Sequence, residues 1–218
     1  MKPVFITGIG TDVGKTVAAA IITEALSADY WKPVQAGFDE GTDALTVQDL
    51  ISNTQSHFHP EVYKLQLPAS PHIAARAENI TINIDTICQQ YSQLTIDNSP
   101  YSQQSPLIIE GAGGLLVPLN DHEFIIDLIK KLDARVILVS RNYLGSINHS
   151  LLTAAVCKMN NLDVIGWIFN DQYMQYEDEI EEWSGYKKIG SIPAVTTINK
   201  AFVQEQAMRI RDQLKNLL

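Results

Sequence analysis

The sequence has little cysteine, no long apolar run and no excess of positive charge. Its two cysteines among 218 residues, Cys88 and Cys157, form no C-x-x-C pair and lack the spacing of metal ligands. This favours two buried thiols in a reducing compartment over a disulfide. No apolar run approaches the roughly 20 residues that a membrane span requires, and the first residues lack a signal-peptide pattern. These absences predict a cytoplasmic protein without a membrane span.

The charge balance also limits the possible partners. With 25 acidic against 16 basic residues, the formal net charge is -9, which argues against a general affinity for nucleic acid or for an anionic membrane. It does not exclude a phosphate ligand, because a local group of N–H donors and lysines can bind one within an acidic protein. The length and the 45% hydrophobic content suit one globular domain covering residues 1–218.

Short apolar segments alternate with longer helical patterns along the chain. The expected strands, buried on both faces, are residues 3–7, 106–111, 134–140 and 162–170. The expected helices are residues 16–27, 124–132, 147–160 and 199–218. This alternation predicts an α/β fold with a mostly parallel sheet and helices on both faces, in which ligands gather beyond the carboxyl ends of the strands. The serine- and glutamine-rich segment 89–106 is expected to be a surface connection, and 177–182 the solvated face of a short helix.

The segment VFITGIGTDVGKT joins an expected strand to an expected helix through a glycine-rich turn. Gly8, Gly10 and Gly14 permit backbone conformations that turn successive N–H groups inward around phosphates. Lys15 begins a helix whose positive dipole end faces the same anion, and Thr16 carries the hydroxyl that commonly ligates magnesium in such loops. This context favours a phosphate-binding loop over a plain glycine turn with an exposed lysine.

Two carboxylates could complete a metal site beside this loop. Glu110 comes at the end of an expected strand, where P-loop proteins hold magnesium, and a buried strand rarely ends in an unpaired acid. Asp43 begins a probable helix, so helix capping explains it equally well. Lys32, in the segment YWKPVQAG, follows a further strand expected after the first helix and adds a cation at the same edge, although a lysine there is more often exposed.

Along nearly its whole length, the chain resembles the dethiobiotin synthetase family. The matching segments, in the family's order, are TGIGTDVGKT, WKPVQAG, TDAL, PASPHIAA, IEGAGGLLVPL, LGSINHSLLT, GWIFND and GSIPAV. The family's phosphate loop has five residues between its glycines, as found from Gly8 to Gly14. The resemblance implies a P-loop NTPase-like fold and a cytoplasmic homodimer acting in biotin synthesis. It implies ATP-dependent ring closure of 7,8-diaminopelargonic acid with carbon dioxide, which yields dethiobiotin, ADP and phosphate.

The resemblance also implies roles for the matching residues. ATP and its Mg²⁺ would be bound by Asp12, Val13, Gly14, Lys15, Thr16, Val17, Asp43, Glu110, Gly111, Ala112, Gly113, Asn170, Asp171, Pro193, Ala194 and Val195. Magnesium itself would be held by Thr16, Asp43 and Glu110. The substrate would meet Thr11, Lys32, Ala36, Gly145 and Asn148, with the segment Leu144 to His149 reaching across the dimer. Lys15, on the transferred phosphoryl group, and Lys32, on the carbamate, would be catalytic.

Two other classes compete with this interpretation. A P-loop switch ATPase would use ATP for conformational control, but such proteins usually carry a second lysine shortly before G-K-T, and GIGTDV has none. An amidotransferase-type ligase would need a reactive cysteine, and neither cysteine has suitable neighbours. Family members commonly have a hydroxyl residue in place of Ala36, which removes one expected hydrogen bond to the substrate.

Overall fold

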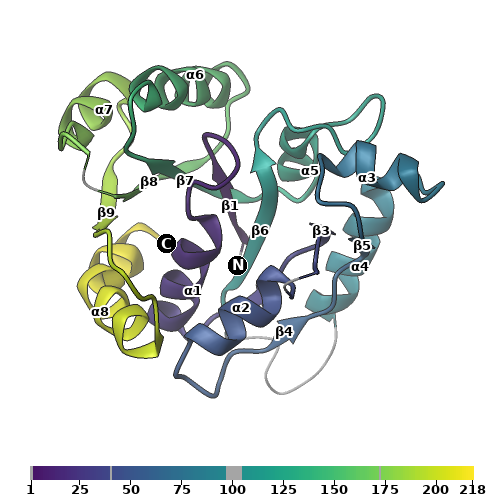
Figure 1. Ribbon diagram of the computed structural model, residues 1–218, viewed down its shortest axis with the longest axis horizontal. Helices are drawn as coiled ribbons and strands as arrows, with labels where there is room; N and C mark the ends of the chain where they lie inside the picture. The colour runs from purple at the N-terminus through teal and green to yellow at the C-terminus, as the bar shows by residue number, and fades with distance from the viewer. Residues whose placement is uncertain (1, 40, 97–104, 172) are drawn as a thin grey trace.

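The computed structural model describes residues 2–39, 41–96, 105–171 and 173–218 (Figure 1). A seven-stranded sheet has the order β4-β2-β6-β1-β7-β8-β9, and all neighbouring strands are parallel. Its strands are β1 (Val4–Gly8), β2 (Asp29–Trp31), β4 (Phe58–His59), β6 (Leu107–Gly114), β7 (Arg135–Arg141), β8 (Val164–Asn170) and β9 (Lys188–Ile192). A second, two-stranded parallel sheet pairs β3 (Val34–Ala36) with β5 (Tyr63–Leu65).

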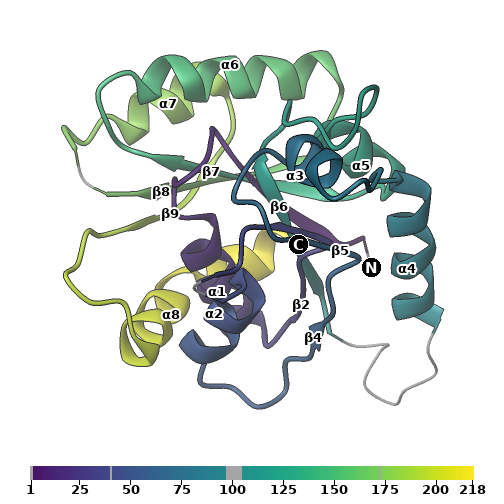
Figure 2. The same cartoon turned by 45° about the vertical axis from the view of Figure 1, so that its right-hand side comes forward.

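Helices cover both faces of the large sheet (Figure 2). One face packs against α1 (Lys15–Leu26), α2 (Asp43–Leu50) and α8 (Lys200–Leu217). The other cluster of buried residues receives side chains from α3 (Pro71–Ala77), α4 (Ile84–Ile96), α5 (Ile125–Lys131), α6 (Ser146–Met159) and α7 (Glu177–Ser184). The fold is therefore the three-layer α/β arrangement that the sequence predicts.

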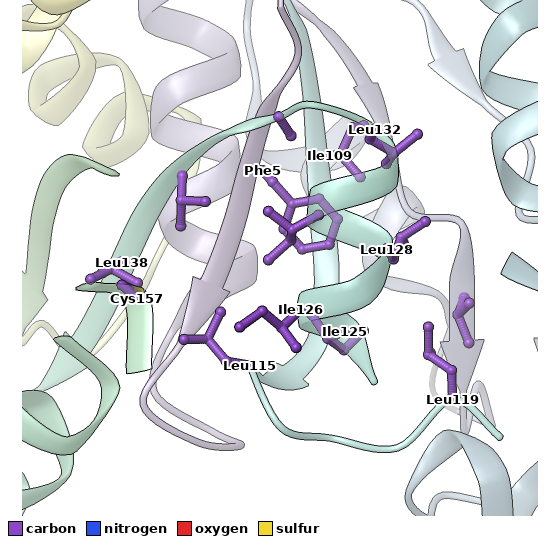
Figure 3. Packing of buried hydrophobic residues seen from close by; sticks show 14 of the residues in the cluster. Phe5, Ile109, Leu115, Leu119, Ile125, Ile126, Leu128, Leu132, Leu138 and Cys157 are labelled. Carbon is purple, nitrogen blue, oxygen red and sulfur yellow. The ribbon is translucent and has the colours of Figure 1, made fainter. Parts of the chain in front are cut away.

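Strand alternation assigns each side chain to one of these two clusters. Val4 and Ile6 of β1 pack with α1, whereas Phe5 between them packs on the opposite face. Figure 3 shows Phe5 together with Ile109 of β6 next to helix α5. Because both faces of each central strand are apolar, the strands appear in the sequence as continuous apolar runs.

The predicted strands and helices are confirmed to within a few residues at their ends. The structure also contains β3, β4, β5, β9, α3 and α4, which the sequence analysis does not identify. The prediction of a surface connection is wrong for residues 89–96, which belong to α4; residues 97–104 lie outside the described part of the chain. Within α7 the acidic face is largely exposed, but Glu177 is buried and accepts hydrogen bonds from Asn142 and Ser191.

Both cysteines are free thiols. Cys157 is fully buried, and burial raises its pKa to about 12, whereas Cys88 is only half-buried. Among the helices that the structure describes, none is long and apolar enough to span a membrane.

Candidate active site at the carboxyl edge of the sheet

The glycine-rich loop follows β1 and leads directly into α1. Of its three glycines only Gly14 has a left-handed conformation, with φ of 87°, and Asp12 adopts a similar one, with φ of 56°. Gly8 is needed for space instead, because a Cβ there would lie 2.6 Å from Val13 Cγ2, while a Cβ on Gly10 would meet no atom within 4 Å. The left-handed conformation that glycine permits is therefore used at Gly14 and not at Gly8 or Gly10.

Lys15 begins α1, as predicted, and its ammonium group stays beside the loop. Its Nζ donates a hydrogen bond to the Gly10 carbonyl at 2.9 Å, and the residue is only 7% exposed. Burial lowers the pKa of Lys15, although the Glu110 carboxylate acts in the opposite direction. The loop thus directs a nearly buried cation toward the N-terminal end of a helix, where a phosphate group can bind.

The register of the sheet brings Lys32 and Glu110 together. Trp31 of β2 pairs with Ile109 of β6, so the next residue along each chain is also adjacent. Lys32 Nζ lies 3.0 Å from Glu110 Oε1 and also donates to the Asp43 carboxylate. Burial disfavours the charge on Lys32, but the two carboxylates outweigh it and raise its pKa. Lys32 is 5% exposed, so the interpretation as a surface lysine is wrong.

Glu110 is the centre of this group of polar side chains. Its Oε1 accepts from Thr16 Oγ1 at 2.9 Å as well as from Lys32, and its Oε2 accepts from the Tyr30 phenol at 2.8 Å. Glu110 does not end its strand, because β6 continues for four further residues to Gly114. The carboxylate is 1% exposed and fully engaged, which explains how an acid can lie inside a buried strand.

Asp43 approaches the same group from α2. The cap of this helix is Thr42, whose side chain accepts a hydrogen bond from the Leu45 N–H, so Asp43 is not the capping residue. The Asp43 N–H donates to Gln35 Oε1 at 3.2 Å, which holds the first turn of α2 against β3. The Asp43 carboxylate is therefore available to Lys32.

These residues surround a cavity of about 800 Å³ at the carboxyl edge of the sheet. Its lining residues are Thr11, Asp12, Gly14, Lys15, Thr16, Lys32, Gln35, Ala36, Asp43, Pro68, Ala69, Ser70, Pro71, Glu110, Ala112, Gly113 and Val117. The cavity thus gathers both expected catalytic lysines, all three expected magnesium ligands and the nearer expected substrate contacts. Its size and its polar groups suit a nucleotide's phosphates together with a small substrate.

Comparison with known proteins agrees with this geometry. The family model described as an AAA domain matches residues 2–201. The ATP-dependent dethiobiotin synthetase BioD of Cytophaga hutchinsonii is 46% identical over 213 residues, which cover 97% of this chain and 98% of that protein. The enzyme of the same name from Christiangramia forsetii is 45% identical, with 98% of each chain covered. The chain belongs to the dethiobiotin synthetase family. The resemblance drawn from the sequence is confirmed.

Solved structures place this dethiobiotin synthetase family member in a wider fold group. The ParA family ATPase from Chlorobium tepidum has a TM-score of 0.55 at 15% identity, with 95% of this chain and 98% of that chain covered. A chain of the MinC:MinD cell division protein complex of Aquifex aeolicus has a TM-score of 0.62 at 14% identity, with 100% of this chain and 96% of that chain covered. These likenesses confirm the P-loop fold; at such identities they carry no functional information.

Several residues that the family resemblance assigns to the nucleotide lie outside the cavity wall. Asn170 at the end of β8 donates from Nδ2 to the Val13 carbonyl at 2.6 Å, and it occupies the space beside Gly14, where a Cβ would lie 2.4 Å from Nδ2. The Asp171 N–H donates to the Ile192 carbonyl at 3.1 Å. That contact places Asp171 beside the start of the segment Pro193, Ala194 and Val195. The residues expected to bind the nucleotide base therefore lie close to one another.

The remaining expected site residues divide by location. Val13 and Gly111 face the core, since a Cβ on Gly111 would lie 2.6 Å from the Phe5 ring. Gly145 precedes α6 with φ of 103°, and Asn148 is exposed in the first turn of that helix, away from the cavity wall. In this chain alone, the structure does not bring Gly145 and Asn148 to the lysines and carboxylates.

Sequence reasoning missed three parts of the site. Tyr30 and Gln35 look like ordinary strand residues in the sequence. The structure shows that Tyr30 donates to the Glu110 carboxylate and that Gln35 accepts from the Asp43 N–H. The segment Pro68–Pro71 forms part of the cavity wall. His72 Nδ1 lies 3.1 Å from Ser70 Oγ, and His72 lines a separate cavity of about 350 Å³.

Proposed function

We propose that this chain is an ATP-dependent dethiobiotin synthetase, which closes the cyclic urea of dethiobiotin from 7,8-diaminopelargonic acid, carbon dioxide and ATP. The observation that carries the proposal is the convergence of two buried lysines on one cavity, Lys15 from the start of α1 and Lys32 from just after β2. Lys15 belongs to the phosphate loop, and Lys32 contacts the carboxylates of Asp43 and Glu110. A nucleotide and a second substrate can therefore be bound side by side, as a synthetase requires.

The oxygen donors at the cavity fit a magnesium ion. Thr16 Oγ1 lies 2.9 Å from Glu110 Oε1, and Asp43 and Glu110 already share one cation, the Lys32 ammonium. Within the described ranges, no group of three His, Cys, Asp or Glu side chains could hold a metal. Magnesium suits such a site, because it usually takes one or two carboxylates and completes its shell with water and substrate phosphates. When bound with ATP, it would neutralise charge on the phosphates.

We place the nucleotide along the loop and the edge of β8. The residues Asp12–Val17 would surround the phosphates with backbone N–H groups at the beginning of α1. The base would lie toward Asn170, Asp171 and the segment 193–195, which are neighbours at the ends of β8 and β9. Gly113 and Ala112 of β6 would border the triphosphate on the opposite side of the cavity.

In the proposed reaction one amine of the diamine captures carbon dioxide as a carbamate. A carbamate oxygen attacks the γ-phosphorus of ATP, and the bond to the bridging oxygen of ADP breaks. The second amine then attacks the carbamic–phosphoric anhydride carbonyl, the ring closes, and phosphate leaves. Lys15 would stabilise the transferred phosphoryl group, and Lys32, held as an ammonium by two carboxylates, would orient the carbamate. Positioning and charge neutralisation replace a strong base.

We further infer a homodimer in the cytoplasm, with the segment Leu144 to His149 at the interface. Leu144, just before α6, is 86% exposed, and Leu152 and Met159 within α6 are 57% and 82% exposed. Exposed apolar side chains of this kind suit burial against a second copy. In such a dimer Gly145 and Asn148 would receive the carboxylate tail of the partner's substrate, which accounts for their distance from the cavity of their own chain.

One experiment separates the synthetase from a switch ATPase or an amidotransferase-type ligase. Phosphate release from ATP is measured with the diamine and bicarbonate together, with each alone, and with neither. A synthetase releases phosphate only when both are present, and dethiobiotin forms in equal amount. Phosphate release that is indifferent to the diamine would reject the proposal. Lys32→Gln provides the residue-level test: diamine affinity and turnover should fall while ATP affinity, measured by calorimetry, stays close to that of the parent.

A further inference from the structure

The phenol of Tyr30 is buried behind the proposed magnesium site. Tyr30 is 0% exposed and is not among the residues that line the cavity, so it cannot touch a bound substrate. Its hydroxyl nevertheless donates to Glu110 Oε2 at 2.8 Å. A buried tyrosine needs a partner for its hydroxyl, and here that partner is a carboxylate of the site rather than a backbone carbonyl.

The sheet explains how this contact arises. Tyr30 pairs in register with Ile108, which lies two residues before Glu110 on β6. Alternate side chains of a strand share one face, so the tyrosine ring lies on the α1 face and its hydroxyl extends along that face to the carboxylate. The ring is packed in the α1-side cluster, with its centroid 5.6 Å from that of Phe58. A rigid side chain therefore sets where the hydroxyl lies.

The hydrogen bonds divide the two carboxylate oxygens of Glu110 between different partners. Oε2 accepts from Tyr30, whereas Oε1 accepts from Thr16 and Lys32, the groups that face the cavity. Three donors on a side chain that is 1% exposed fix the plane of the carboxylate. We propose that Tyr30 is a positioning residue for the proposed metal site, which holds Glu110 so that only Oε1 is presented to the cation.

This inference rests on the proposed function, because it assumes that Glu110 binds magnesium. Partners in the outer shell of a metal site orient the ligands and, when removed, typically lower metal affinity by roughly 10- to 100-fold. Phenylalanine would fill the same core volume as the Tyr30 ring. Tyr30→Phe therefore removes the hydrogen bond that orients Glu110 and keeps the apolar packing of the ring.

The test is the magnesium concentration that half-saturates binding of a fluorescent, non-hydrolysable ATP analogue. Tyr30→Phe should raise this magnesium midpoint by about tenfold, while analogue affinity at saturating magnesium stays within about twofold of the parent. Tyr63→Phe is the matched control, since it removes a phenol oxygen that accepts from the Asn83 N–H instead of donating to a site carboxylate. Urea unfolding of each variant verifies that a folded protein is being titrated.

A double variant separates failure of the inference from failure of the proposed function. Glu110→Gln should itself raise the magnesium midpoint, and adding Tyr30→Phe to it should change nothing further, because Tyr30 acts through Glu110. If Glu110→Gln leaves the midpoint unchanged, the proposed metal site is wrong. If Glu110→Gln raises it but Tyr30→Phe leaves it unchanged or lowers it, the positioning role is wrong. Additive shifts in the double variant would also overturn that role.

Discussion

Replacing Lys32 by glutamine should destabilise the folded protein far more than an ordinary lysine substitution. The Lys32 ammonium is buried against Glu110, which is 1% exposed, so the substitution leaves a buried carboxylate without its main cation. Breaking a buried ion pair by removing one partner costs about 3–5 kcal/mol. We expect about 3 kcal/mol here, because glutamine retains an N–H donor, and the second carboxylate, Asp43, has a side chain that is 32% exposed and keeps contact with water.

The assay is urea unfolding of four proteins: the parent, Lys32→Gln, Glu110→Gln and the double variant. A loss of about 3 kcal/mol corresponds to a midpoint lower by about 1–3 M urea, since slopes for proteins are about 1–3 kcal/mol/M. The double variant should recover at least half of the loss of Lys32→Gln, because two neutral amides can hydrogen-bond to each other without a buried charge. This recovery distinguishes an ion pair from general damage to the core.

Lys2 provides the matched control. It forms an ion pair with Asp133 at 2.7 Å, but the two side chains are 48% and 76% exposed. Lys2→Gln should therefore change the free energy of unfolding by no more than about 0.5 kcal/mol. If Lys32→Gln costs no more than Lys2→Gln, or if the double variant is less stable than either single variant, the buried pair does not contribute as argued.

Two further predictions concern the loop and the β4 edge. Lys15→Ala should lower turnover by roughly a hundredfold or more, because it removes a cation from the developing phosphoryl charge; phosphate release within a few-fold of the parent would contradict the assigned role. The carboxylate of Asp29 is disfavoured by burial, but hydrogen bonds from His59 and His57 outweigh this and lower its pKa. Its contribution to stability should be complete above roughly pH 4, the unfolded pKa, and disappear as pH falls through the lower folded pKa. The difference in urea midpoint between the parent and Asp29→Asn should therefore shrink from pH 6 to pH 3. A constant difference would count against a stabilising role for the hydrogen bonds from His57 and His59 to Asp29.

The central part of the fold could be predicted from the sequence because its signals are local. β1, β6, β7 and β8 are apolar runs buried on both faces, and the loop before α1 combines glycine, lysine and threonine in a fixed order. Glu110 could be proposed because a charged residue within such a run is costly without a partner. The family resemblance added the ligand assignments.

The rest depends on which strands become neighbours. β4 has two residues and β3 three, too few to show a periodicity. Tyr30 has the composition of a core residue, and its contact with Glu110 appears only when β2 is paired with β6. Lys32 could not be told from a surface lysine until that pairing buried it. Residues 89–96 were misassigned because the composition was taken to indicate a connection, although glutamine, the commonest residue there, is a good helix former.

The strand order has a consequence for the synthesis of the protein on the ribosome. β1 is translated before β6 and β7, yet it lies between them, and their paired residues begin at Ile108 and Arg135. Until those segments have been translated, the nascent chain exposes an apolar strand with both edges unpaired, which is the condition under which chains aggregate or recruit chaperones. The phosphate loop follows that strand directly. Thr16 and Lys32 therefore gain their shared partner, the Glu110 carboxylate, only after 94 and 78 further residues have been translated.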